Sequence, residues 1–233
     1  MTLDQQIQQI TALSRECWGK ENVAKVTQAA EMAIHFHEGQ FRKSDGAPYV
    51  THCFDVARNC FKWGLVDVTA VCAALLHDSI EDAAPEKEAV RVITEFDPEV
   101  ADIVLAVSKI SNKQSGGGDD LPATYRRILR AASKDLRALL VKAFDVLDNS
   151  RTFSVHKPHK AKVKASLGLI YVGMARRLGM MELADQLIQQ VAPYLMPVQY
   201  KRAMLRLEEL RRLQGATIKK LPHHLEAMIG DGL

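Results

Sequence analysis

The spacing of apolar residues constrains the fold of this chain more than any other feature. In residues 22–38, the side chains of Val23, Val26, Ala30 and Ala33 recur every three or four positions. That spacing gathers them on one face of an α-helix. No stretch of the sequence alternates apolar and polar residues convincingly, as a half-buried strand does. We therefore expect an all-α protein.

The same periodicity continues along the chain and predicts further helices. Thr51 and Asp67 are candidate N-caps, because their short side chains can accept hydrogen bonds from the first N–H groups of a helix. Residues 111–122 hold three successive glycines and two aspartates, which predicts a mobile loop around Ser115 to Asp120. The predicted helices cover residues 22–38, a segment that starts near Thr51, and residues 67–82, 86–95, 97–108, 123–132, 134–148, 161–178, 180–191, 197–213 and 222–229.

Length and composition limit the class of protein. A chain of 233 residues with 47% hydrophobic residues suits one domain, or one domain with a small appendage. The 31 basic and 28 acidic residues leave a net charge of +3, too balanced to indicate a nucleic-acid partner, although it favours an anionic small-molecule substrate. No apolar run reaches the roughly 20 residues that cross a bilayer, and the four cysteines form no CxxC pair. We expect a cytoplasmic protein without membrane or nucleic-acid partners and leave its oligomeric state open.

The segment AALLHDSIED, residues 73–82, carries the strongest sign of chemistry. An apolar run ends abruptly in His77 and Asp78, and a continuous helix would place Glu81 one turn further on. Imidazole and carboxylate groups are the ligands of a divalent cation, and carboxylates packed this closely repel one another without one. The alternative is a charged helix end, with Glu81 and Asp82 facing water.

Two other positions supply further candidate ligands. His52 ends the loop GAPYVTH, and Asp145 lies in the apolar segment VKAFDVLDN. A carboxylate in apolar surroundings is costly unless it is paired or bound to a metal. Simpler roles remain open for both: His52 can cap a helix, and Asp145 can form a salt bridge with Lys142 or Arg151.

The order of these motifs resembles that of the HD phosphohydrolase superfamily. Four segments match, in order, the hydrolase domain of bifunctional Rel/Spo alarmone enzymes: HEGQFRKSDGAPYVTH, AALLHDSIED, YRRILRAASKDLRALLVKAFDVLDNSRT and IYVGMARRLGMMEL. Small alarmone hydrolases share the first three. The resemblance implies an HD-domain helical bundle with extra C-terminal helices. It suggests a hydrolase domain in residues 1–200 and a helical extension in residues 201–233, without a synthetase domain.

The resemblance also implies an activity, a cofactor and a set of site residues. The activity is Mn²⁺-dependent removal of the 3′-pyrophosphate from guanosine tetra- and pentaphosphate. The residues alone leave room for Arg42 and Lys43 as a solvated pair and Tyr171 as a core aromatic. The implied residues are the metal ligands His52, His77, Asp78 and Asp145, the catalytic pair Glu81 and Asp82, and the substrate contacts Arg42, Lys43, Asn149, Thr152 and Tyr171.

Four positions depart from the family pattern: Cys53, Ala83, Val146 and Asp148. The complete ligand set argues that hydrolysis is retained. Asp148 replaces a usual His or Tyr, so we expect an added negative charge beside the substrate and an altered base preference. Three functions remain: hydrolysis of a guanosine or adenosine alarmone, hydrolysis of another phosphorylated nucleotide such as NADPH, and alarmone binding without catalysis.

Overall fold

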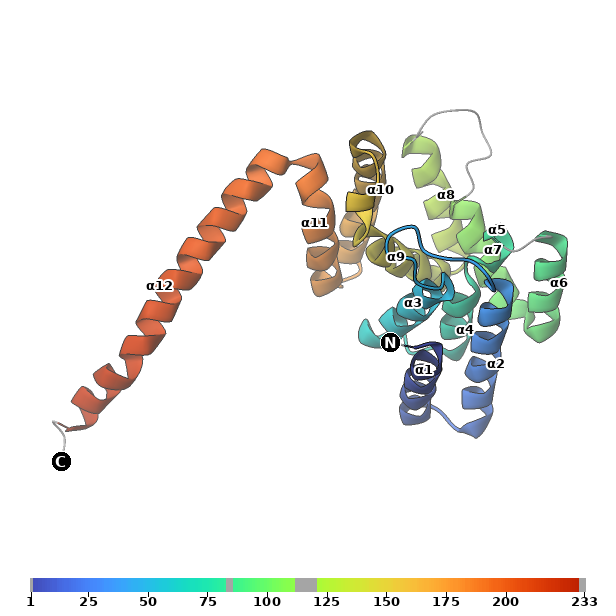
Figure 1. The fold of residues 1–233 in the computed structure, drawn as a ribbon, viewed down its shortest axis with the longest axis horizontal. Coiled ribbons are helices and arrows are strands. Elements are labelled where there is room, and N and C mark those ends of the chain that lie inside the picture. Colours follow the sequence, from blue (N-terminus) through green and yellow to red (C-terminus); the bar gives the residue numbers. More distant parts are fainter. Residues whose placement is uncertain (1, 83–85, 112–120, 231–233) are drawn as a thin grey trace.

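The expected all-α class is confirmed. The computed structural model describes residues 2–82, 86–111 and 121–230, and these residues form helices and contain no β-strand (Figure 1). The helices are α1 (Leu3–Cys17), α2 (Lys20–Phe36), α3 (Val50–Lys62), α4 (Val68–Leu76), α5 (Ser79–Asp82), α6 (Glu86–Phe96), α7 (Pro98–Ser111), α8 (Leu121–Lys134), α9 (Leu136–Ser150), the 3₁₀ turn η1 (Phe153–Val155), α10 (Pro158–Arg177), α11 (Met181–Leu195) and α12 (Pro197–Gly230).

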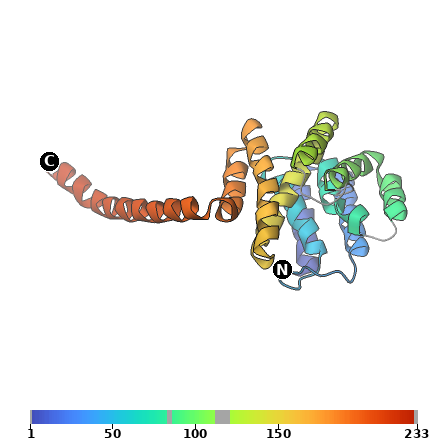
Figure 2. The ribbon, with the colours of Figure 1, turned by 90° about the horizontal axis from the view of Figure 1, so that it is seen from above.

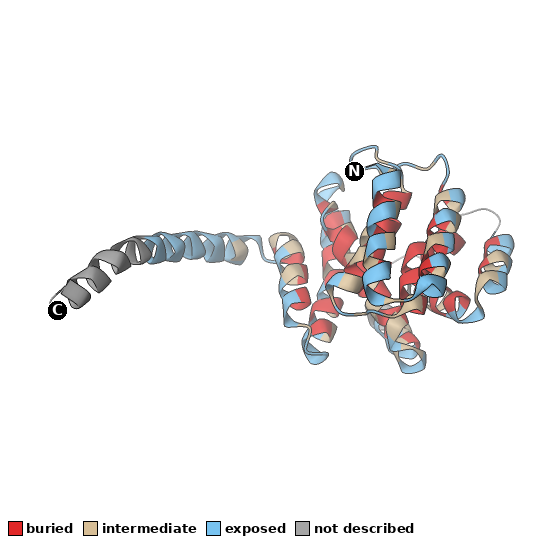
Figure 3. Ribbon diagram, turned by 90° about the horizontal axis from the view of Figure 1, so that it is seen from below, coloured by how far each residue is buried: buried red, intermediate tan, exposed pale blue. Residues whose placement is uncertain are grey.

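Helix α4 lies at the centre of the bundle. Its residues 69–76 are all buried, and it packs against α2, α3, α7 and α9. A helix that is apolar on every side is stable only when other helices surround it. Figure 3 shows the buried residues concentrated on the inward faces of the bundled helices. The C-terminal end of α4 therefore lies in the interior of the protein, and His77 and Asp78 follow it directly in the chain.

The predicted helix over residues 67–82 is interrupted in the structure. Helix α4 ends at Leu76, and α5 begins only at Ser79. The ring Nδ1 of His77 lies 2.8 Å from the carbonyl oxygen of Ala74. In a continuous helix that oxygen would accept from the N–H of Asp78, so the histidine side chain competes with the backbone. The interruption lets His77 and Asp78 face the same interior point.

The two predicted N-caps had different outcomes. Asp67 caps α4, because its Oδ1 accepts a hydrogen bond from the Ala70 N–H at 2.8 Å. Thr51 was wrong as a cap, since α3 begins at Val50 after Tyr49 and Thr51 lies buried within its first turn. The loop before α3 stays short and ordered: Phe41 and Pro48 form an isolated backbone bridge across it.

Helix α1 was missed by the periodicity. Its buried stripe consists of Gln6, Ile10 and Ser14, so two of the three inward residues are polar. A usable signal was present in the capping box, where Thr2 and Gln5 exchange side-chain-to-backbone hydrogen bonds.

The two helices predicted at residues 197–213 and 222–229 are one helix, α12, which extends away from the bundle (Figure 2). Side chains 201–215 along it are all exposed. Among the helices in the described residues, none combines the length and the apolar composition of a membrane-spanning segment. The loop expected around Ser115 to Asp120 lies outside the described residues.

The contact between α10 and α11 gives a test of the packing. A Cβ at Gly168 would lie 2.8 Å from Val191 Cγ1, whereas one at Gly173 on the same helix would meet no atom within 4 Å. Replacing glycine by alanine in a helix gains about 1 kcal/mol, but overpacking costs about 1–3 kcal/mol. We expect urea unfolding to show a more stable Gly173→Ala variant and a less stable Gly168→Ala variant, with Val191→Ala restoring the latter. An equal gain at both glycines would contradict this packing.

Candidate metal centre

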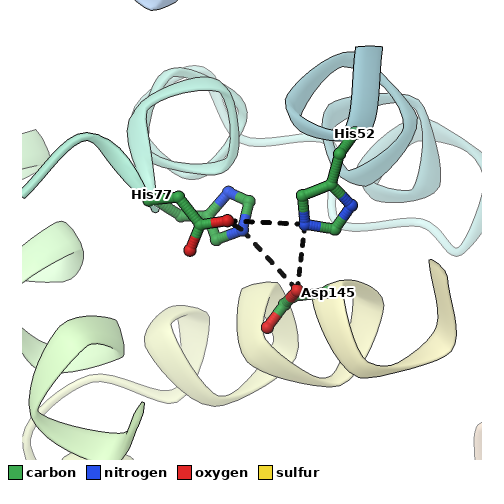
Figure 4. Close-up of side chains that lie close together, drawn as sticks. His52, His77 and Asp145 are labelled. Atoms are coloured by element: carbon green, nitrogen blue, oxygen red, sulfur yellow. Dashed lines mark hydrogen bonds and ion pairs between the residues drawn. The ribbon is translucent and has the colours of Figure 1, made fainter. Parts of the chain in front are cut away.

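Three parts of the bundle bring the four predicted ligands together. His52 comes from α3, His77 and Asp78 from the link between α4 and α5, and Asp145 from α9. Each offers one ligand atom, and these atoms all lie within 4.8 Å of one another. Figure 4 shows the two imidazole rings and the Asp145 carboxylate pointing toward a common centre. All four residues are buried, with Asp78 the most exposed at 8%.

The atoms that converge are the Nε2 atoms of both histidines and one oxygen of each aspartate. His52 Nε2 lies 3.0 Å from Asp145 Oδ1 and 3.6 Å from Asp78 Oδ2. His77 Nε2 lies 3.1 Å from Asp78 Oδ2 and 3.7 Å from Asp145 Oδ1. It makes no well-aligned hydrogen bond although it is buried. A buried nitrogen aimed at two carboxylates fits a cation between them.

The charges in the cluster are strongly coupled. Burial by itself lowers the pKa of each imidazole, but the neighbouring carboxylates reverse this and raise the pKa of His52 to about 9 and of His77 to about 10. Burial by itself raises the pKa of Asp78, but the charge of His77 outweighs this effect and holds that pKa well below the usual range. Two imidazolium protons carry the same charge as one divalent ion. The donor set therefore fits a divalent cation with neutral histidine ligands.

Asp145 has two separate sets of partners. Its Oδ2 pairs with Lys142 Nζ at 2.6 Å, while its Oδ1 faces the histidines and accepts from the Asn149 side-chain amide. The salt bridge that the sequence left as an alternative thus coexists with the ligand geometry. Lys142 and Asn149 hold the carboxylate from two sides, as outer contacts commonly do around metal ligands.

Tyr49 is a contact that the sequence reasoning missed. Its hydroxyl donates to Asp78 Oδ2 at 2.7 Å, and so fixes the aspartate across the site. The usable signal was its position three residues before His52, which places both at the start of α3.

Comparison with known proteins identifies the family. A family model described as an HD domain matches residues 29–181, which include all four candidate ligands. This chain belongs to the HD-domain family. The predicted membership of the HD family is thereby confirmed. Helix α11 begins at the residue where the match ends.

Several longer proteins are similar to this HD-domain chain. It is 33% identical over 201 residues to a probable GTP pyrophosphokinase of Mycobacterium leprae, covering 86% of this chain and 25% of that protein. It is 31% identical over 212 residues to a guanosine-3′,5′-bis(diphosphate) 3′-pyrophosphohydrolase of Aquifex aeolicus, covering 88% and 30%. It is 38% identical over 153 residues to a protein of the same name from Haemophilus influenzae, covering 65% and 22%.

The chain thus spans a third or less of the length of these curated relatives. A solved structure, described as a metazoan orthologue of SpoT that hydrolyses ppGpp, aligns with a TM-score of 0.49 and 24% identity, over 82% of this chain and 96% of that one.

Within the HD domain, Asp148 lies beside the candidate ligand His52. It is only 2% exposed, and its carboxylate accepts from His52, Arg42 and Arg151. Burial by itself raises its pKa, but these partners lower it overall. The negative charge expected beside the substrate is thus paired with three partners on the Nδ1 side of His52, and the altered base preference stays a prediction.

The predicted substrate contacts occupy several environments. Arg42 pairs with Asp148, whereas Lys43 is exposed on the same loop. Asn149 lies against Asp145, and the Thr152 hydroxyl donates to the Asn149 backbone carbonyl oxygen at 3.0 Å. The set is thus split between the metal cluster and the surface around it.

Tyr171 lies close to the same cluster. Its side chain is 3% exposed, and burial raises its pKa against the lowering effect of the Lys142 charge. Its hydroxyl therefore stays protonated and remains a hydrogen-bond donor. This position is compatible with both the core and the substrate-contact interpretations.

The predicted catalytic pair follows the ligands on α5. Glu81 is exposed, which agrees with either a solvated helix end or access to a bound substrate. The backbone of Asp82 ends α5, and its side chain lies outside the described residues.

The geometry predicts metal content. We expect the purified protein to contain about one divalent ion per chain, and His77→Ala to lose it, because the remaining carboxylates would be left short of a ligand partner. His159→Ala, which removes an exposed histidine from α10, is the matched control and should retain the ion. Elemental analysis measures both. Full metal content in His77→Ala would contradict the assignment.

Proposed function

We propose that this chain is a cytoplasmic, Mn²⁺-dependent hydrolase that removes the 3′-pyrophosphate from guanosine or adenosine tetra- and pentaphosphate. The observation that carries the proposal is the buried cluster of two histidines and two aspartates in an HD domain. The names of the Aquifex aeolicus and Haemophilus influenzae relatives supply the reaction. We assign hydrolysis to residues 1–200 and treat residues 201–233 as a helical extension.

His52, His77, Asp78 and Asp145 are the proposed ligands of the ion. Mixed imidazole and carboxylate ligands suit Mn²⁺ among other divalent metals. When bound, such an ion acts as a Lewis acid and makes a water molecule nucleophilic near neutral pH. Tyr49, Lys142 and Asn149 hold the two carboxylates in place through contacts at their oxygens.

The proposed reaction is a hydrolysis at phosphorus. The oxygen of water bonds to the phosphorus that is attached to the ribose 3′ oxygen. The bond between this phosphorus and the 3′ oxygen breaks, and pyrophosphate is released. Glu81 accepts the proton of the attacking water and later returns it to solvent, and the 3′ oxygen takes up a proton from solvent as it becomes a hydroxyl group. Glu81 is suited to this role because it is exposed and lies one short turn after the ligand Asp78. We assign Asp82 as its partner.

A group of basic residues around Lys43 supports an anionic substrate. Burial and the charges of Lys164, Lys160 and Lys43 lower the pKa of His156, which places these groups in one electrostatic neighbourhood. Polyphosphate is attracted to such a region, and lysine serves there as a point charge. We assign substrate contacts to Arg42, Lys43, Asn149, Thr152 and Tyr171, with Lys43 facing the phosphates.

Product analysis tests this function. Purified protein with Mn²⁺ should convert guanosine or adenosine tetraphosphate into the matching nucleoside 5′-diphosphate and pyrophosphate, as separated by anion-exchange chromatography. Release of inorganic phosphate from NADPH, with no cleavage of either alarmone, would assign the site to another nucleotide. Tight binding of an alarmone without products would instead assign a binding module. Either result would contradict the proposal.

Glu81→Gln separates catalysis from binding. The amide keeps the size of the side chain but cannot accept the proton, and general acid–base groups contribute about 10²–10⁴-fold to rate. We expect turnover to fall by a factor in that range while Mn²⁺ and substrate still bind. Glu88→Gln, on the exposed first turn of α6, is the matched control and should keep normal turnover. Retention of more than about a third of turnover in Glu81→Gln would refute the role.

A further inference from the structure

Asp148 connects two parts of the proposed site. It lies on α9, three residues after the ligand Asp145, and is 2% exposed. Its Oδ2 lies 2.7 Å from His52 Nδ1 and accepts from Arg42 Nη2 at 2.8 Å. Its Oδ1 accepts from Arg151 Nη1 at 3.3 Å. One buried carboxylate oxygen is thus shared by a candidate metal ligand and a candidate substrate contact.

The geometry at His52 matches that of a supported metal ligand. Its Nε2 faces Asp145 and Asp78, whereas its Nδ1 faces Asp148 on the opposite side of the ring. A carboxylate that accepts from Nδ1–H leaves the lone pair on Nε2 for a metal and fixes the ring orientation. Asp148 therefore presents His52 to the ion rather than competing for it.

The same carboxylate fixes Arg42. The guanidinium also contacts Asp55 Oδ2 at 3.5 Å, so it spans α9 and α3. The backbone N–H of Arg42 donates to the Ala47 carbonyl oxygen at 2.7 Å, which ties the residue to its loop. The loop that carries Arg42 and Lys43 is thereby anchored to the helix that supplies the ligand Asp145.

We propose that Asp148 is a positioning residue that couples metal binding to substrate binding, acting through His52 on the ion and through Arg42 on the nucleotide. This inference rests on the proposed function, because it requires an ion at His52 and an anionic substrate at the loop. It predicts that a change at Asp148 alters both the Mn²⁺ affinity and the KM for substrate.

The test compares three variants of the full chain. Asp148→Ala removes the acceptor, and loss of such a contact weakens metal binding by about 10–100-fold. Asp148→Asn keeps the shape and an acceptor oxygen for Nδ1–H but loses the charge that holds Arg42. For Asp148→Asn we expect Mn²⁺ to bind at least about threefold more weakly than to wild type. We also expect its KM to rise by a larger factor than the factor by which its kcat falls.

Asp135→Asn is the matched control, since it changes the aspartate that caps the other end of α9. It should lower the melting temperature and leave Mn²⁺ affinity and KM unchanged. Calorimetric titration of chelator-treated protein with Mn²⁺ measures the affinity, and initial rates give KM and kcat. A merely structural Asp148 would behave like Asp135 in every readout.

The outcomes separate this inference from the proposed function. If wild-type protein binds no Mn²⁺, the proposed metal centre itself is wrong. If wild type binds Mn²⁺ and Asp148→Asn matches it in both affinity and KM, the positioning role is overturned. Should Asp148→Ala fail to fold by circular dichroism, the Asp148→Asn result decides alone.

Discussion

The structure depends on the burial of two carboxylates and two imidazoles around one point. Isolated charges in a protein interior are expensive, and removing one partner leaves the others uncompensated. Here Asp78 and Asp145 face His52 and His77. Tyr49 and Asn149 donate to the carboxylate oxygens that face the histidines, and Lys142 pairs with the outward oxygen of Asp145. His77 and Asp78 follow the apolar helix α4 into the core, and α3 and α9 pack against α4. A divalent ion satisfies this arrangement because it supplies positive charge at the centre.

Much of this arrangement could be predicted from local sequence. The spacing of apolar residues gave most helices, and the step from apolar residues to HDSIED marked the end of α4. The four candidate ligands were then placed by the resemblance, and the structure brings them within 4.8 Å. The interruption after Leu76 was not predictable from periodicity, because it depends on a side-chain contact between His77 and the Ala74 carbonyl oxygen. Helix α1 escaped notice because polar residues occupy its buried face.

Asp148 shows why charge in a sequence is not the same as electrostatics in a fold. Counted alone, it adds a negative charge close to the proposed substrate. In the structure its oxygens are taken by His52, Arg42 and Arg151, residues up to 106 positions away. Arg151 lies only three residues further along the chain, but His52 and Arg42 reach Asp148 through the packing of α9 against α3 and the loop before it, which no local pattern encodes. Asp148, which was expected to repel the substrate, therefore supports His52 and Arg42 instead.

The position of the metal is the most direct test of whether these four side chains form a metal site. Crystals soaked with Mn²⁺ and measured on both sides of the manganese absorption edge should give one strong anomalous peak inside the bundle. We expect that peak about 2–2.5 Å from the Nε2 atoms of His52 and His77 and from one oxygen each of Asp78 and Asp145, the usual range of metal–ligand distances. Manganese bound elsewhere, with these four side chains still paired to one another, would contradict it.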